Sequence, residues 1–66
     1  MNIPKLKGKM VEMGYNVETF ATQIGIDRST LYRKLECGEK ISIGEAQRMK
    51  DVLSLSNEEV SAIFFN

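Results

Sequence analysis

The segment from Val17 to Leu35 constrains the fold of this chain more than any other. Apolar residues recur at helical spacing on both sides of a glycine, Gly25. Glycine tolerates the left-handed backbone conformation that ends many helices, and Asp27 is a good N-cap for a second helix. The segment therefore predicts two short helices, within about residues 17–36, joined by the three-residue turn Gly25-Ile26-Asp27. The inward positions are expected to be Val17, Phe20, Ala21, Ile24, Ile26, Leu31 and Leu35.

Two capping boxes predict where two later helices begin. The segments Ser42–Glu45 and Ser56–Glu59 each place a glutamate three residues after a serine. In such a pair each side chain accepts a hydrogen bond from the backbone N–H of the other residue, which satisfies two donors at a helix start. We therefore expect one helix from about Ile43 to Leu53 and another from Asn57 to about Phe65.

A further helix is expected from about Ile3 to Met13. Pro4 suits its first turn, where the missing N–H has no helical partner. Leu6, Met10 and Met13 recur at spacings of four and three and form one apolar stripe. All four methionines of the chain are expected to fill the core. The sequence thus predicts a single all-α domain of five helices over residues 1–66.

Composition narrows the classes of function. Nine basic and nine acidic residues give a formal net charge of zero, which counts against nucleic-acid binding. The basic residues are nevertheless clustered near the start of the chain and around the helix after Gly25. Histidine is absent, so we expect no enzyme, no metal site and no cofactor. A lone Cys37 and the lack of a long apolar run predict a cytoplasmic protein without a membrane partner.

The helix after Asp27 is polar on the side away from its two leucines. A polar helix joined by a tight turn to an apolar one is typical of a helix-turn-helix, whose second helix enters the major groove of double-stranded DNA. Arginine there reads guanine by pairing with its O6 and N7 atoms. Two alternatives stay open: the arginines are plain solvated surface, or Tyr32 is partly buried against the next helix. The residues predicted to contact bases are Arg28, Ser29, Tyr32 and Arg33.

A second set of polar residues is predicted to contact phosphates. Such contacts fix the register of a protein on DNA without reading its sequence. The alternative for the two lysines of this set is that they are ordinary surface residues. The set consists of Asn16, Thr30, Lys34 and Lys40.

Two segments of the chain carry a resemblance to a known family. GIDRSTLYRKL (residues 25–35) is similar to the turn and recognition helix, and LSNEEVSAIFF (residues 55–65) to the fifth helix, of the lambda-repressor-like, Xre-type helix-turn-helix proteins. These proteins include phage repressors and Cro-like regulators. The resemblance covers nearly the whole chain and implies a five-helix fold. It also implies base-facing positions at Arg28, Ser29 and Arg33, whereas Val17 stands where the family often has glutamine.

The last apolar residues predict a dimer interface. Ile63, Phe64 and Phe65 are consecutive, and a helix cannot bury all three on one side. One small domain covers about one half-site, so we expect a homodimer on a palindromic operator, with recognition helices about 34 Å apart. The alternative is that the phenylalanines pack on the core of the monomer.

Two functions are compatible with these patterns. The first is a sequence-specific DNA-binding transcriptional regulator, a repressor or a Cro-like protein, with Arg28–Glu36 in the major groove. The second is a protein-interaction domain, such as an antitoxin-like adaptor, with the same fold and weak DNA binding. The net charge of zero keeps the second function open.

Overall fold

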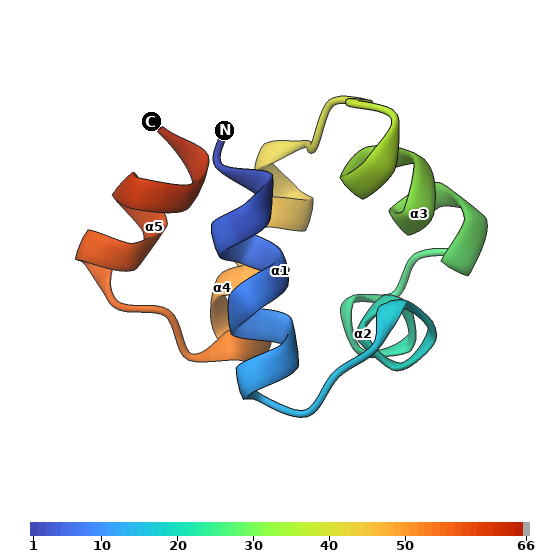
Figure 1. The fold of residues 1–66 in the computed structure, drawn as a ribbon, viewed down its shortest axis with the longest axis horizontal. Coiled ribbons are helices and arrows are strands. Elements are labelled where there is room, and N and C mark those ends of the chain that lie inside the picture. Colours follow the sequence, from blue (N-terminus) through green and yellow to red (C-terminus); the bar gives the residue numbers. More distant parts are fainter. Residues whose placement is uncertain (66) are drawn as a thin grey trace.

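The computed structural model describes residues 1–65, which form five helices and no strand (Figure 1). The prediction of an all-α domain is therefore confirmed for these residues. The third and fourth helices have the predicted bounds, and the first and last each end one residue earlier than predicted. The helices are α1 (Ile3–Glu12), α2 (Val17–Ile24), α3 (Arg28–Glu36), α4 (Ile43–Leu53) and α5 (Asn57–Phe64).

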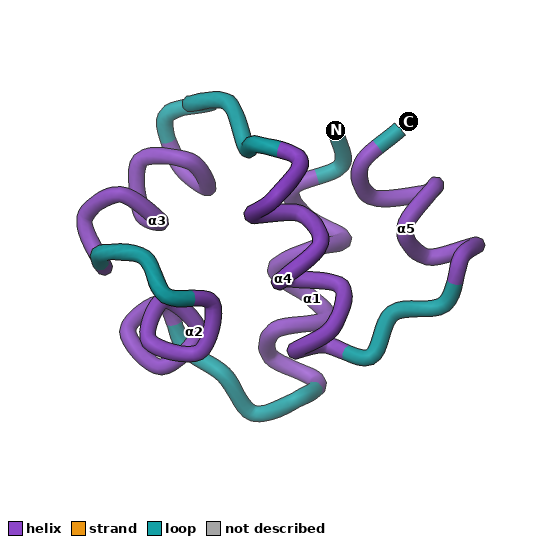
Figure 2. Tube along the Cα trace, turned by 180° about the vertical axis from the view of Figure 1, so that it is seen from behind, coloured by secondary structure: helices purple, strands orange, loops and turns teal. Residues whose placement is uncertain are grey.

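α1 and α4 lie in the middle of the molecule, with α5 on one side and the α2–α3 pair on the other (Figures 1 and 2). α5 packs on α1, and α2 packs on both α3 and α4. The start of the chain lies beside the end of α5, where the Asn2 N–H donates to the Ile63 carbonyl at 2.7 Å. In a molecule that measures 28 × 23 × 20 Å, this arrangement leaves α3 at one end.

A side chain caps the start of each of these helices. Both predicted capping boxes are confirmed, and the Ser42–Glu45 box is closed by hydrogen bonds of 2.8 and 3.1 Å. A third box joins Asn16 and Thr19 at the start of α2. The serine–glutamate pattern does not reveal it, because asparagine and threonine take the places of the serine and the glutamate. The five caps are Asn2, Asn16, Asp27, Ser42 and Ser56.

The core draws on every helix and on two loop residues, Ile41 and Leu55. Met1 and Met13 are exposed, so the prediction that all four methionines fill the core is wrong for these two. α1 ends one residue before Met13, and the Tyr15 ring packs near Phe20 instead, with ring centroids 5.6 Å apart. The buried apolar residues are Leu6, Met10, Phe20, Ala21, Ile24, Leu31, Leu35, Ile41, Met49, Leu53, Leu55 and Ile63.

The turn between α2 and α3 has the predicted geometry. Gly25 has a φ of +76°, in the left-handed region, and the following Ile26 N–H donates to the Ala21 carbonyl at 3.1 Å. From α4, the Arg48 Nε donates to the Ile24 carbonyl at 2.8 Å. The end of α2 is thus fixed by its own turn and by a side chain of α4, and this fixes the direction in which α3 begins.

Candidate nucleic-acid interface

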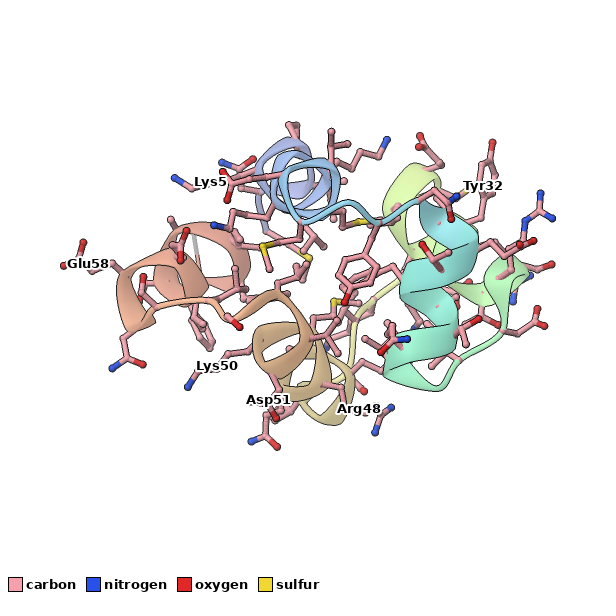
Figure 3. All side chains as sticks on the ribbon, turned by 90° about the horizontal axis from the view of Figure 1, so that it is seen from below. Lys5, Tyr32, Arg48, Lys50, Asp51 and Glu58 are labelled. Carbon is pink, nitrogen blue, oxygen red and sulfur yellow. The ribbon has the colours of Figure 1, made fainter. Side chains whose placement is uncertain are left out.

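The outer face of α3 gathers the four side chains predicted to contact bases. Leu31 and Leu35 are buried on the opposite face of the helix. Tyr32 is 54% exposed and projects from the α2–α3 end of the molecule, on a different side from Arg48 (Figure 3). Tyr32 is thus an exposed residue on another side of the molecule, contrary to the alternative in which it is partly buried against α4. One shallow surface hollow, here called the α3 depression, is lined by Arg28, Ser29, Tyr32 and Arg33.

Arg28 joins the α3 depression to a neighbouring hollow at the start of α2. That hollow is lined by Asn16, Val17, Glu18 and Arg28 itself. Arg28 Nη1 lies 3.7 Å from Glu18 Oε2, and both side chains are exposed. A continuous surface therefore runs from the start of α2 along the outer face of α3.

Arg33 is held by two hydrogen bonds. Its Nε donates to the Glu39 carboxylate at 3.2 Å, and its Nη2 donates to the Thr30 hydroxyl at 3.3 Å. Thr30 lies one turn earlier on α3, whereas Glu39 lies in the loop between α3 and α4. The Arg33 guanidinium thus has a defined position at the exposed surface. By contrast, Arg28 faces a carboxylate at 3.7 Å, beyond hydrogen-bond distance.

Lys34 faces the interior, which corrects its predicted placement as an outward phosphate contact. It is 7% exposed, and its Nζ donates to the Lys40 carbonyl at 2.8 Å and lies 3.1 Å from Glu45 Oε1. Its place between Leu31 and Leu35 puts the stem on the buried face of α3, while the ammonium finds polar partners. The alternative of an ordinary surface lysine is also wrong for Lys34.

Ion pairs connect this buried lysine to the surface. Burial raises the pKa of the Glu45 carboxyl, but the Ser42 N–H and the Lys34 ammonium stabilise its charged form more, so the pKa lies below its ordinary value of 4.5. Lys34 Nζ also lies 3.8 Å from Glu39 Oε1. A chain of charges therefore runs from the start of α4 through Lys34 and Glu39 to Arg33.

The other predicted phosphate contacts lie on or near the outer surface. Asn16 and Lys40 are exposed, and Thr30 is half-buried. The Asn16 side-chain oxygen accepts the Thr19 N–H at 2.8 Å, which leaves its amide nitrogen as the group to donate to a phosphate. The Thr30 hydroxyl accepts from Arg33 and keeps its own proton to donate. A phosphate contact for these three residues stays a prediction.

Three acidic residues of this region do not stand out in the sequence. Glu18 lies on a different helix from Arg28, and Glu39 lies six residues beyond Arg33, in a loop. Neither pair has the three- or four-residue spacing that places charges together on one helix. Glu45 is visible only as a capping residue. The tertiary fold is what brings these carboxylates to the basic side chains.

A third hollow, here called the apolar depression, lies between α4 and the end of α5. Phe65 is 82% exposed at its edge, and Phe64 is half-buried against the core. Ile63 is 0% exposed, so its predicted place in a dimer interface is wrong. α5 turns this side chain into the monomer core. The apolar depression is lined by Met1, Ile41, Ser42, Ile43, Ala46, Gln47, Lys50, Val60, Phe64 and Phe65.

Comparisons of the chain with protein-family models, curated proteins and solved structures gave no match. Among residues 1–65, no three histidine, cysteine, aspartate or glutamate side chains are grouped so that they could hold a metal ion. None of the helices in the same residues has the length and apolar character needed to cross a membrane.

Proposed function

We propose that this domain is a sequence-specific regulator of transcription that binds double-stranded DNA. In this proposal α2, the Gly25–Asp27 turn and α3 form a helix-turn-helix of the lambda-repressor-like type, and α3 enters the major groove. One observation carries the proposal: the four residues predicted to contact bases line a single exposed hollow on α3. The opposite face of the helix is anchored in the core by Leu31, Lys34 and Leu35.

The chemistry of the α3 depression suits base edges. Arg28 and Arg33 each carry the planar donor pair that matches guanine O6 and N7. Ser29 follows Arg28 at the start of α3, where recognition helices contact bases. Tyr32 supplies an exposed ring for a thymine methyl or a sugar. Asn16, Thr30 and Lys40 remain the proposed phosphate contacts, and Lys34 is left out because its ammonium is buried.

A salt titration tests whether DNA binding is substantial. The affinity of the protein for a random-sequence duplex is measured at several salt concentrations. Each phosphate neutralised by a lysine or arginine contributes about −0.9 to the slope of log affinity against log salt. We expect a slope steeper than about −2 for one domain. A slope near zero, or no binding at low salt, contradicts the proposal.

We also propose that two copies pair through the apolar depression when they bind a palindromic operator. Phe65 and Ile43 are exposed beside the depression, which supports an apolar contact between copies. Sedimentation of a Phe65→Ala variant tests this, with Val11→Ala as a matched control. Val11 is a 76% exposed apolar residue on α1, outside the depression. We expect only Phe65→Ala to reduce self-association, and equal association of both variants contradicts the proposal.

A protein-interaction domain is the second candidate function. Two observations favour it: the net charge is zero, and each of the two exposed arginines of α3 faces a carboxylate. In that case the apolar depression is the main binding surface and DNA affinity is weak at every salt concentration. The salt titration separates the two functions, because only the first requires a steep slope.

A further inference from the structure

Two of the five N–H donors of Arg33 are already used within the chain. Nε is bonded to Glu39 and Nη2 to Thr30. The remaining three donors belong to Nη1 and Nη2, which are the atoms that pair with guanine O6 and N7. The internal hydrogen bonds therefore fix the guanidinium and leave donors of Nη1 and Nη2 available to pair with a guanine.

Glu39 lies between two basic side chains, Arg33 and Lys34. Its Oε2 accepts from Arg33 at 3.2 Å, and its Oε1 lies 3.8 Å from the Lys34 ammonium. Lys34 is in turn fixed by the Lys40 carbonyl at 2.8 Å and by Glu45 at 3.1 Å. The Arg33 guanidinium is thus linked, through the Glu39 carboxylate, to an ion pair with the buried Lys34.

We propose that Glu39 is a positioning residue that makes Arg33 selective for guanine. This inference rests on the proposed function. A guanidinium already held in one geometry loses less conformational freedom when it pairs with a base. The Glu39 carboxylate also repels nearby phosphates, which disfavours non-specific contacts of the same arginine with the DNA backbone. Both effects increase the difference between the affinity for the specific sequence and the affinity for other DNA.

Glu18 provides a matched control within the same surface. It carries the same charge as Glu39 and also faces an arginine of α3, but at 3.7 Å. Removal of Glu18 should relieve repulsion of phosphates without loosening a hydrogen-bonded arginine. Glu18→Ala and Glu39→Ala therefore share the change in charge and differ in the change in positioning.

The test measures discrimination at a single base pair. Fluorescence anisotropy gives the affinity of each variant for the duplex that the parent protein enriches from a random pool, and for the same duplex with one G·C pair replaced in turn. The pair read by Arg33 is the one at which Arg33→Ala abolishes discrimination. At that pair we expect Glu39→Ala to reduce discrimination about tenfold, while affinity for a scrambled duplex rises.

Glu18→Ala is expected to raise affinity for both duplexes and to leave discrimination at that pair unchanged. In an Arg33→Ala background, Glu39→Ala should change discrimination no further. Glu39 is exposed, and thermal melting checks that its variant is folded at the assay temperature. If Glu39→Ala and Glu18→Ala behave alike on a duplex that the parent does enrich, the inference fails and the proposed function stands. If the parent enriches no sequence, both fail.

Discussion

On the outer face of α3, Arg33 is exposed and its guanidinium lies at the surface beside Glu39. On the inner face, the next residue, Lys34, is almost fully buried and its ammonium is bonded to the loop and to Glu45 of α4. The two residues are adjacent cations, yet one turns toward solvent and the other toward the core. Their place on the helix relative to Leu31 and Leu35, rather than their charge, assigns one to the candidate site and the other to the scaffold.

The largest expected effect is a difference in stability between variants of these two neighbouring residues. Lys34→Ala leaves the half-buried Glu45 carboxylate without its cationic partner and should lower the free energy of unfolding by about 2–3 kcal/mol. Arg33→Ala removes only exposed contacts and should change it by less than about 0.5 kcal/mol. Chemical denaturation of both variants measures the difference. Equal losses would contradict the division between the two faces of α3.

The next effect concerns binding by the outer face. Arg28→Ala should weaken binding to the enriched duplex by about 1–3 kcal/mol and relax the sequence preference, because a base contact is lost. The melting temperature should stay near that of the parent, since Arg28 is exposed and lies beyond hydrogen-bond distance of Glu18. A profile across a library of operator sequences that matches the parent's would contradict the assignment of Arg28 as a base reader.

A smaller effect concerns the turn between α2 and α3, which sets the orientation of α3. Gly25 has a positive φ, so Gly25→Ala should destabilise the domain by about 1–2 kcal/mol, although an added Cβ meets no atom within 4 Å. Gly8 lies inside α1 with equal space around it, so Gly8→Ala should stabilise by about 0.5–1 kcal/mol. Thermal melting of both variants gives the sign of each change in stability. A shift of the same sign in both variants would show that backbone conformation at Gly25 does not matter.

The smallest effect is a dependence of stability on acid pH. The Ser56 N–H and the Lys9 ammonium lower the pKa of Glu59 to about 2, and Glu45 also has a pKa below its ordinary value of 4.5. In the unfolded chain both carboxyls take up protons near pH 4.5, so stability is present above that pH and falls as pH drops toward 2. Glu45 pairs with Lys34 on the inner face of α3. In Glu45→Gln, stability should therefore fall less steeply as the pH drops, as measured by denaturation between pH 5 and pH 2. A slope identical to the parent's would exclude a stabilising charge at Glu45.

Local signals account for most of the fold. The caps at Asp27, Ser42 and Ser56, and the left-handed Gly25, could be predicted because each depends on a few consecutive residues. Where helices end was harder to predict. α1 stops before Met13 because the chain turns so that Tyr15, rather than Met13, packs on the core.

The candidate site was predictable only in part, because some of its contacts join distant segments. The gathering of four side chains on α3 follows from helical periodicity and is present in the structure. Lys34, three residues after Leu31, lies on the inner face by the same periodicity, but its partner Glu45 lies on the next helix and the partner of Arg33, Glu39, lies in a loop. Likewise, Ile63 is buried because α5 packs on α1, which the run of three apolar residues does not reveal.

We propose that the outer face of α3 reads DNA sequence. Selection of bound molecules from a random duplex pool tests it most directly, with a variant that carries both Arg28→Ala and Arg33→Ala as the control. We expect the parent protein to enrich a motif that contains guanines and is arranged as a palindrome with half-sites about 34 Å apart, and the double variant to lose those guanines. A pool that stays random after selection with the parent protein, or the same motif with both proteins, would contradict sequence reading by α3.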